Sequence, residues 1–150
     1  MSCFPDTSFL CALYRTQVNS TQADQFMAGL SGTLGLSSLL LLEFRQSVRL
    51  QIRLHLNDRT KGYPRREGQQ MMNDLQIDLN AGLLTTIPVD WPAVHQRAEA
   101  LSSAHTLAGG HRLADILHVA TAVHLGVTEF LTFDGNQKIL AEAEGLVVPV

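Results

Sequence analysis

The sequence predicts an α/β protein in which a parallel sheet lies between helices. Short apolar runs typical of buried strands alternate along the chain with longer segments whose apolar residues recur every three or four positions. Because a helical segment separates each strand candidate from the next, these strands cannot pair as simple hairpins. Right-handed crossovers between them favour parallel strands with helices on both faces of the sheet.

Helix caps and turn residues divide the first half of the chain into elements. Ser20 or Thr21 caps one helix and Ser37 or Ser38 caps the next, while the glycine at position 62 and the proline at position 64 indicate a turn. The expected elements are a strand at 2–4, a helix around 9–14, a helix after 20, a short strand at 34–36, a long helix from 39 to about 56 and a helix to about 80.

Glycines separate the elements of the second half. Gly82 ends one helix, Gly109 and Gly110 break the following one, and Gly145 is the C′ residue of the last. The expected strands are 83–89, 128–133 and 146–150, and the expected helices are 91–107, 113–125 and 137–143.

The composition is that of an ordinary globular protein. The 150 residues are 45% hydrophobic and 17% charged, which predicts a single domain, 1–150, whose core needs neither disulfides nor a structural metal. Cys3 and Cys11 lack metal-ligand spacing and suit thiols in a reducing cytosol. The chain starts without a basic region, and its longest aliphatic run, 39–42, is too short to cross a bilayer. We therefore expect a cytoplasmic protein, neither exported nor embedded in a membrane.

Charge is distributed unevenly along the chain, although the formal net charge is only −3. Residues 44–66 contain seven basic residues and a single acid, Asp58, so the rest of the chain is acidic. Arg45, Arg49 and Arg53 recur at every fourth position, which aligns them along one helix face. Such a face either follows the phosphates of a nucleic acid or is simply solvated.

Four carboxylates stand in apolar surroundings, where an isolated charge is costly. Glu43 interrupts a run rich in leucine, and Asp115 lies early in a strongly apolar helix. Asp6 and Asp134 follow the carboxyl ends of two predicted strands. In a parallel sheet these strand ends, and the helices that start beside them, meet at one edge. We therefore expect the four acids to converge.

Each acid also has a structural interpretation. Asp6 is typical of a helix N-cap, Asp134 of a turn before glycine, and Asp115 of a favourable charge in the first turn of a helix. Glu43, in a second turn, fits such an interpretation least well. As a group, clustered carboxylates repel one another, and Mg²⁺ or Mn²⁺ relieves that repulsion through oxygen ligands alone. Such an ion serves phosphoryl chemistry by activating water and stabilising charge on the phosphate.

Four short motifs in a fixed order cover nearly the whole chain. They are Asp6-Thr7-Ser8 after the first strand, Leu40-Leu41-Leu42-Glu43-Phe44-Arg45 in the third helix, Arg112-Leu113-Ala114-Asp115 followed by His118 and Ala120, and Leu131-Thr132-Phe133-Asp134 followed by Leu140-Ala141 and Gly145-Leu146. With this ordered set, the sequence resembles PIN-domain ribonucleases, specifically the VapC-type toxins of bacterial type II toxin–antitoxin pairs. Two departures are Pro5 directly before Asp6 and Gly135-Asn136 directly after Asp134.

The resemblance implies both a fold and an activity. It implies a three-layer α/β/α sandwich with a five-stranded parallel sheet, often dimeric. It also implies that Asp6, Glu43, Asp115 and Asp134 form an acidic Mg²⁺/Mn²⁺ site of an endoribonuclease. Members of this family cleave structured RNA such as transfer or ribosomal RNA, and a small antitoxin protein inhibits them.

Several residues near the acids have supporting roles that the sequence leaves open. The resemblance implies a hydrogen bond from Thr7 or Ser8 beside the site, and Asn136 either shares or replaces the fourth ligand role. Arg112 either binds a phosphate or neutralises an acid. His118 shares a helix stripe with Asp115, so it either supports the site or serves the core. The basic face at 45, 49 and 53 would guide RNA or hold the antitoxin.

Three rival interpretations are weaker. Arg112 and His118 loosely match the short motif of metal-independent HEPN ribonucleases, but those domains are all-helical and this chain has clear strand signals. A phosphatase of the haloacid dehalogenase type requires a second aspartate two residues after Asp6, where Ser8 stands. A catalytically silent PIN-like binding module normally lacks one or more of the acids. The leading hypothesis is a Mg²⁺-dependent endoribonuclease, with the silent module as its alternative.

Overall fold

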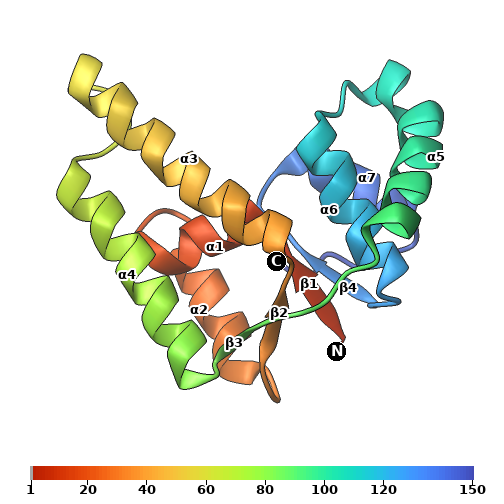
Figure 1. The fold of residues 1–150 in the computed structure, drawn as a ribbon, viewed down its shortest axis with the longest axis horizontal. Helices are drawn as coiled ribbons and strands as arrows, with labels where there is room; N and C mark the ends of the chain where they lie inside the picture. The colour runs from red at the N-terminus through yellow and green to blue at the C-terminus, as the bar shows by residue number, and fades with distance from the viewer. Residues whose placement is uncertain (1) are drawn as a thin grey trace.

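The predicted α/β class is confirmed by a computed structural model that describes residues 2–150. Helices alternate with short strands along this part of the chain (Figure 1). In order, the elements are β1 (Cys3–Pro5), α1 (Thr7–Tyr14), α2 (Ser20–Gly29), β2 (Leu34–Leu36), α3 (Ser38–Asn57), α4 (Arg65–Ala81), β3 (Leu84–Thr86), α5 (Trp91–Gly109), α6 (Leu113–His124), β4 (Glu129–Leu131) and α7 (Gly135–Ala143).

The strands pair in parallel, as the sequence predicts. β1 pairs with β4, with Phe4 opposite Phe130, and β2 pairs with β3, with Gly35 opposite Thr85. β1 and β2 also lie side by side, which brings the two pairs together at the centre of the molecule. Among the described residues, the five-stranded sheet is therefore reduced to two pairs and one additional parallel bridge, between Glu129 and Val147.

Prolines explain why the sheet is smaller than expected. The Asp6 amide donates to the Leu131 carbonyl on β4, and because successive residues alternate in direction, position 5 faces β2 instead. Pro5 has no N–H to donate there. The β2–β3 pairing ends where the Ile87 amide donates to the Leu36 carbonyl, because Ser37 directly after β2 is the N-cap of α3. Positions 146–150 contain a further proline and form only the bridge at 147.

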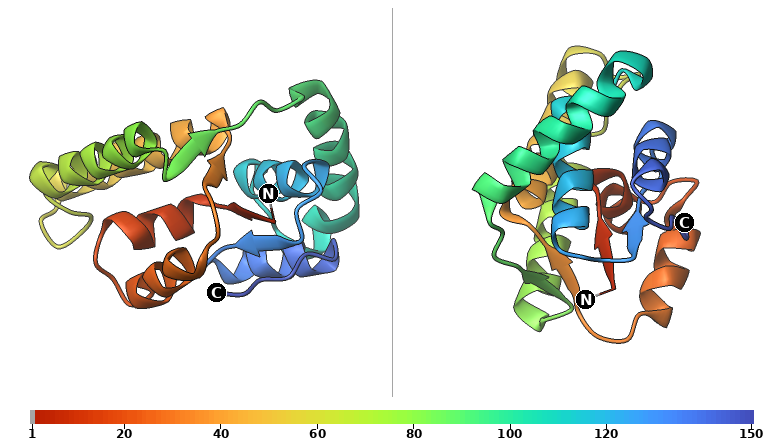
Figure 2. Two further views of the ribbon diagram at one scale, coloured as in Figure 1. Left: turned by 90° about the horizontal axis from the view of Figure 1, so that it is seen from below. Right: turned by 90° about the vertical axis from the view of Figure 1, so that its right-hand side faces the viewer.

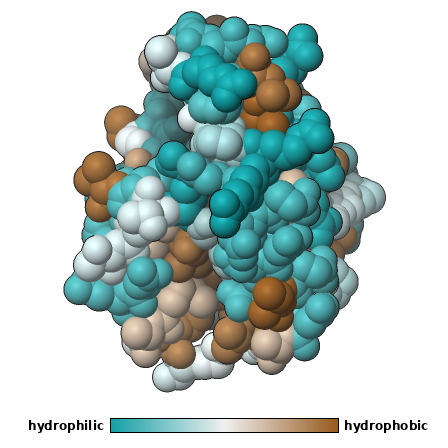
Figure 3. Space-filling model, turned by 90° about the vertical axis from the view of Figure 1, so that its left-hand side faces the viewer, coloured by the Kyte–Doolittle hydropathy of each residue, from teal (hydrophilic) through white to brown (hydrophobic). Residues whose placement is uncertain are grey.

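Two groups of helices enclose the strands. α1 to α4 lie on one side of β1 and β4, and α5, α6 and α7 lie on the other (Figure 1). The paired helices α3 and α4 extend beyond the strands, as the view from below shows (Figure 2). This extension carries the basic segment, and its face is mostly hydrophilic with separate hydrophobic patches (Figure 3). None of the helices in residues 2–150 combines the length and apolar character needed to cross a membrane.

An aromatic cluster packs directly behind the carboxyl ends of β1 and β4. Phe9 on α1 is fully buried and meets the ring of Phe26 edge-on, with ring centroids 6.0 Å apart. On its other side Phe9 stacks on Phe133, with centroids 5.9 Å apart. Phe9 and Phe133 are close in sequence to Asp6 and Asp134, so this packing holds the two strand ends together.

Replacing Phe9 with alanine should remove this support. We expect Phe9→Ala to lower the free energy of unfolding by about 3–5 kcal/mol, because it leaves a cavity among buried rings. Urea unfolding followed by circular dichroism measures the change. Leu107→Ala is the control, since Leu107 is 100% exposed and should change stability by less than about 0.5 kcal/mol. Equal losses in the two variants would contradict this description of the core.

Candidate active site

The four predicted acids occupy one edge of the strands. Asp6 directly follows β1, and Asp134 lies three residues after β4 and begins α7. Asp115 lies in the first turn of α6, and Glu43 lies in the second turn of α3, which follows β2. The parallel direction of the strands therefore brings all four to the carboxyl edge.

Asp6 is a buried carboxylate held by three donors. Its Oδ1 accepts hydrogen bonds from the Ser8 hydroxyl at 2.7 Å and the Phe9 amide at 2.9 Å, and its Oδ2 accepts one from the Thr132 hydroxyl at 2.6 Å. Asp6 is thus the N-cap of α1 as well as a site residue. Burial raises its pKa, although the three hydrogen bonds and the nearby His118 work in the opposite direction.

Glu43 is oriented by two side chains from different elements. The Thr7 hydroxyl of α1 donates to its Oε2, and Nε2 of His118, one turn after Asp115 on α6, hydrogen-bonds to the same oxygen. Burial works to raise the pKa of Glu43, but the contacts with His118 and Thr7 outweigh it, so the pKa lies below its usual value. His118 is fully buried, and its Nδ1 has no hydrogen-bond partner among the described residues.

Asp115 is paired with Arg112, the residue that precedes α6. Nε of Arg112 lies 3.0 Å from Oδ2 of Asp115, and an η nitrogen lies 3.2 Å from Oδ1, so the guanidinium holds both oxygens. The same η nitrogen lies 3.8 Å from Oδ2 of Asp134. Asp115 also accepts a hydrogen bond from the Gln137 amide at 3.2 Å. The contact with Asp115 raises the pKa of Arg112, with smaller contributions from Asp134 and Glu43.

Asp134 joins the site to the start of α7. Its Oδ1 accepts the backbone amides of Asn136 at 2.8 Å and Gln137 at 3.1 Å, which makes it the N-cap of this helix. Its own amide donates to the Thr132 hydroxyl at 3.0 Å. Thr132 therefore links Asp134 to Asp6, just as Arg112 links Asp134 to Asp115.

A family model of the PIN domain matches residues 3–143, nearly the whole chain. The chain belongs to the PIN domain family. No curated protein matches it in sequence.

Several solved structures share the fold of this PIN domain. VapC20 of Mycobacterium tuberculosis, a sarcin-ricin loop cleaving toxin, superposes with a TM-score of 0.67 at 20% identity, covering 97% of each chain. A toxin–antitoxin complex from Klebsiella pneumoniae superposes with a TM-score of 0.66 at 16% identity, covering 100% of this chain and 98% of the other. FitAcB from Neisseria gonorrhoeae superposes with a TM-score of 0.59 at 18% identity, covering 97% of this chain and 95% of the other. The predicted PIN-like α/β fold is confirmed.

A Mg²⁺ or Mn²⁺ ion at this edge remains a prediction. Within residues 2–150, no three side chains of His, Cys, Asp or Glu stand close enough together to hold an ion. In this arrangement hydroxyls, His118 and Arg112 hold most of the carboxylate oxygens. The donors themselves fit a hard cation, since four carboxylates supply only oxygen. Glu43 and Asp134 are 31% and 34% exposed, so the edge is open to solvent.

The structure also places the supporting residues. Thr7 and Ser8 both hydrogen-bond to site carboxylates, as the resemblance implies, and Arg112 neutralises acids in this structure. The Asn136 backbone, rather than its side chain, contacts Asp134. Of the two roles considered for His118, the geometry favours support of the site, because its ring contacts Glu43.

The basic face lies apart from the acids, along α3. Arg45 is directed towards α4, where it hydrogen-bonds to Gln76 at 3.3 Å, whereas Arg49 and Arg53 are exposed on the part of α3 that extends beyond the strands.

Sequence reasoning missed the roles of Thr132 and Gln137. Thr132 precedes Asp134 by two residues, so the period of an extended segment places the two side chains on the same side. Gln137 stands three residues after the N-cap Asp134, which is the capping-box spacing. Both signals are present in the sequence, but neither identifies the distant partners, Asp6 and Asp115.

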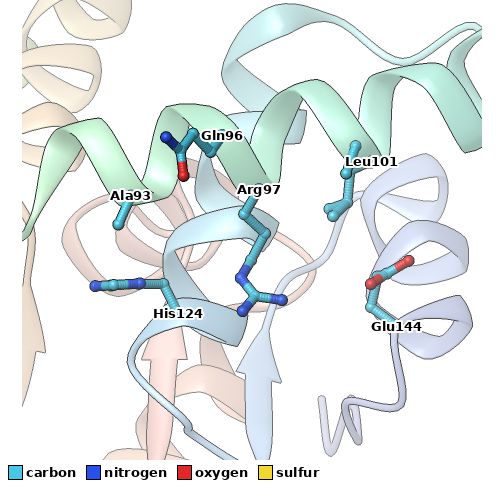
Figure 4. Close-up of a pocket in the computed structure, with 7 residues that line it drawn as sticks. Ala93, Gln96, Arg97, Leu101, His124 and Glu144 are labelled. Carbon is cyan, nitrogen blue, oxygen red and sulfur yellow. The ribbon is translucent and has the colours of Figure 1, made fainter.

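A hollow of about 470 Å³ lies away from the acids (Figure 4). Arg97 of α5, His124 at the end of α6 and Glu144 after α7 contribute to its lining. Asp115 and Asp134 stand at the opposite, N-terminal ends of α6 and α7. None of the four acids lines this hollow, so it is separate from the candidate site.

Thr132→Val should test the link between Asp6 and Asp134. The substitution keeps the shape but removes one donor to a buried carboxylate and the acceptor for the Asp134 amide, so we expect a loss of about 2–3 kcal/mol in the free energy of unfolding. Thr121→Val is a matched control, because Thr121 is equally buried and its hydroxyl donates only to the Leu117 carbonyl within α6. Denaturant midpoints that shift equally in both variants would refute a special role for Thr132.

Proposed function

We propose that this PIN domain is a metal-dependent endoribonuclease of the cytoplasm, acting as the toxin of a toxin–antitoxin pair. The observation that carries the proposal is the set of four carboxylates at the carboxyl edge. Thr132 and Arg112 link Asp134 to Asp6 and Asp115, and His118 holds Glu43 beside them. Structural stability alone does not require such a cluster, because like charges repel. The similar folds of VapC20, a sarcin-ricin loop cleaving toxin, and of a toxin–antitoxin complex support this assignment.

Mg²⁺ or Mn²⁺ would be held by Asp6, Glu43, Asp115 and Asp134, with Asn136 as the residue that would share or replace the fourth ligand. When bound, such an ion supplies an activated water and stabilises negative charge on the scissile phosphate. The neighbouring residues of this chain would orient the metal ligands. Side chains that orient such ligands strongly influence metal affinity and catalytic rate.

The orienting contacts come from three parts of the fold. Ser8 and Thr132 hold the two oxygens of Asp6, while Thr7 and His118 both hold Oε2 of Glu43, whose Oε1 has no hydrogen-bond partner within residues 2–150. Buried Asp6 lies at the back of the site, and the partly exposed Glu43 and Asp134 lie at its opening. A phosphodiester would therefore approach from the side of Glu43 and Asp134.

The RNA and the antitoxin are recognised outside this cluster. The exposed bases of the extended α3–α4 pair, which include Arg49 and Arg53, provide a positive surface for RNA phosphates or for an acidic antitoxin segment. Structured RNA of the transfer or ribosomal class and a homodimeric assembly remain the expectations derived from the family resemblance.

Cleavage of total bacterial RNA tests the proposed activity. Purified protein should make discrete cuts with Mg²⁺ or Mn²⁺ and none with EDTA. Glu43→Gln, Asp115→Asn and Asp6→Ala should each reduce the rate by more than about 100-fold, because loss of residues that merely orient ligands already costs about 10–100-fold. Mapping the cut ends identifies the RNA.

The control is Glu142→Gln, which removes an exposed acid of α7 outside the cluster and should leave cleavage unchanged. Circular dichroism confirms that each variant is folded. Cleavage that survives both EDTA and the three substitutions would refute the acidic site. Folded protein that cuts no RNA under any condition would favour a catalytically silent binding module.

A further inference from the structure

The positive charge of Arg112 lies beside two of the four carboxylates, Asp115 and Asp134. Its guanidinium holds both oxygens of Asp115, at 3.0 and 3.2 Å, and reaches towards Asp134 at 3.8 Å. A fork of two parallel N–H bonds to one carboxylate is the strong geometry for such a pair. The charge of Arg112 thereby lies among the carboxylates that the proposed function assigns to the metal.

The pairing blocks the oxygens that an ion would need. The Asp115 side chain is only 3% exposed, and its two oxygens contact Arg112 and the Gln137 amide. A divalent ion cannot bind Asp115 without displacing at least one of these nitrogen donors, and two cations at the same carboxylate also repel each other.

Most of the Arg112 side chain is open to solvent, so water can replace the carboxylates around its guanidinium. Its side chain is 75% exposed, although the carboxylate that it holds is buried. It lies at the N-cap of α6, outside the regular turns, and the Arg112 amide separately donates to Asp115 at 3.3 Å. The backbone can therefore keep its contact with Asp115 when the guanidinium leaves.

We propose that Arg112 is the resident cation of the acidic site, a side chain that neutralises Asp115 and Asp134 in the metal-free protein and competes with the divalent ion for them. This inference rests on the proposed function, because it concerns the same four acids. It assigns Arg112 the role of a built-in competitor, which sets the metal concentration at which the site fills.

The competition has two consequences of opposite sign. Without metal, loss of Arg112 leaves the buried Asp115 with only amide donors, so the protein should become less stable. With metal, the same loss removes both the competitor and its repulsion, so the ion should bind more tightly. A purely structural ion pair would produce the first effect but not the second.

Mn²⁺ titration calorimetry on the full chain tests this inference. We expect Arg112→Gln to bind Mn²⁺ about tenfold more tightly than the unchanged protein, because a two-point charged contact no longer has to be broken. Arg112→Lys keeps the charge but loses the fork, and should fall between the two. Arg97→Gln is the matched control, since it removes the same charge from the separate hollow of Figure 4 and should leave the affinity unchanged.

Thermal unfolding of the same proteins provides a readout that does not depend on activity. In EDTA, the melting temperature of Arg112→Gln should be about 2–4 °C lower, as expected for a small loss of stability in a chain of this size. Saturating Mn²⁺ should remove this difference.

The outcomes separate the inference from the proposed function. If the unchanged protein binds Mn²⁺ and Arg112→Gln binds it equally or more weakly, the inference is wrong and the proposed site stands. If Arg97→Gln tightens binding as much as Arg112→Gln does, the effect is one of overall charge and the inference is also wrong. If neither the unchanged protein nor Arg112→Gln binds Mn²⁺, both the inference and the metal-dependent function fail.

Discussion

The placement of four carboxylates at one edge of the strands is the constraint around which this PIN domain is organised. Parallel pairing of β1 with β4 and of β2 with β3 directs the acids to the same edge, and burial makes the charge of Asp6 costly unless donors hold it. The fold holds the four acids with hydroxyl donors, backbone amides, one histidine and one arginine. Apart from His118, which lies in the middle of α6, these groups belong to helix starts or strand ends, so local structure and the site stabilise each other.

Three of the four acids that the proposed function assigns to the metal also stabilise helices. Asp6 and Asp134 cap α1 and α7, and Asp115 lies in the first turn of α6, where the helix dipole favours a negative charge. The structural interpretation of these three acids is confirmed, and it is compatible with the proposed functional one, since a helix N-terminus at a sheet edge favours anions there. Glu43 is the exception, because it caps nothing and depends on Thr7 and His118 for its orientation.

Much of this arrangement could be predicted from the sequence, because it depends on local signals. Apolar periodicity located the helices and strand positions, and the direction of parallel strands predicted that the four acids would share an edge. The extent of the sheet was not predictable in the same way, because Pro5 and Pro149 lack amides whose partners would lie on other strands. The pairing of Arg112 with Asp134, the contact between His118 and Glu43, and the bridge through Thr132 also depend on tertiary geometry. A single sequence shows these residues but not their partners.

The position of a bound ion is the most direct test of the central claim. Two-dimensional ¹H–¹⁵N NMR with substoichiometric Mn²⁺ shows where the ion binds, because paramagnetic broadening falls steeply with distance. If the four acids hold the ion, broadening will be centred on the amides around Asp6, Glu43, Asp115 and Asp134 and will be reversed by excess Mg²⁺. Broadening centred on the hollow near Arg97 and Glu144, or spread evenly over the surface, would contradict it.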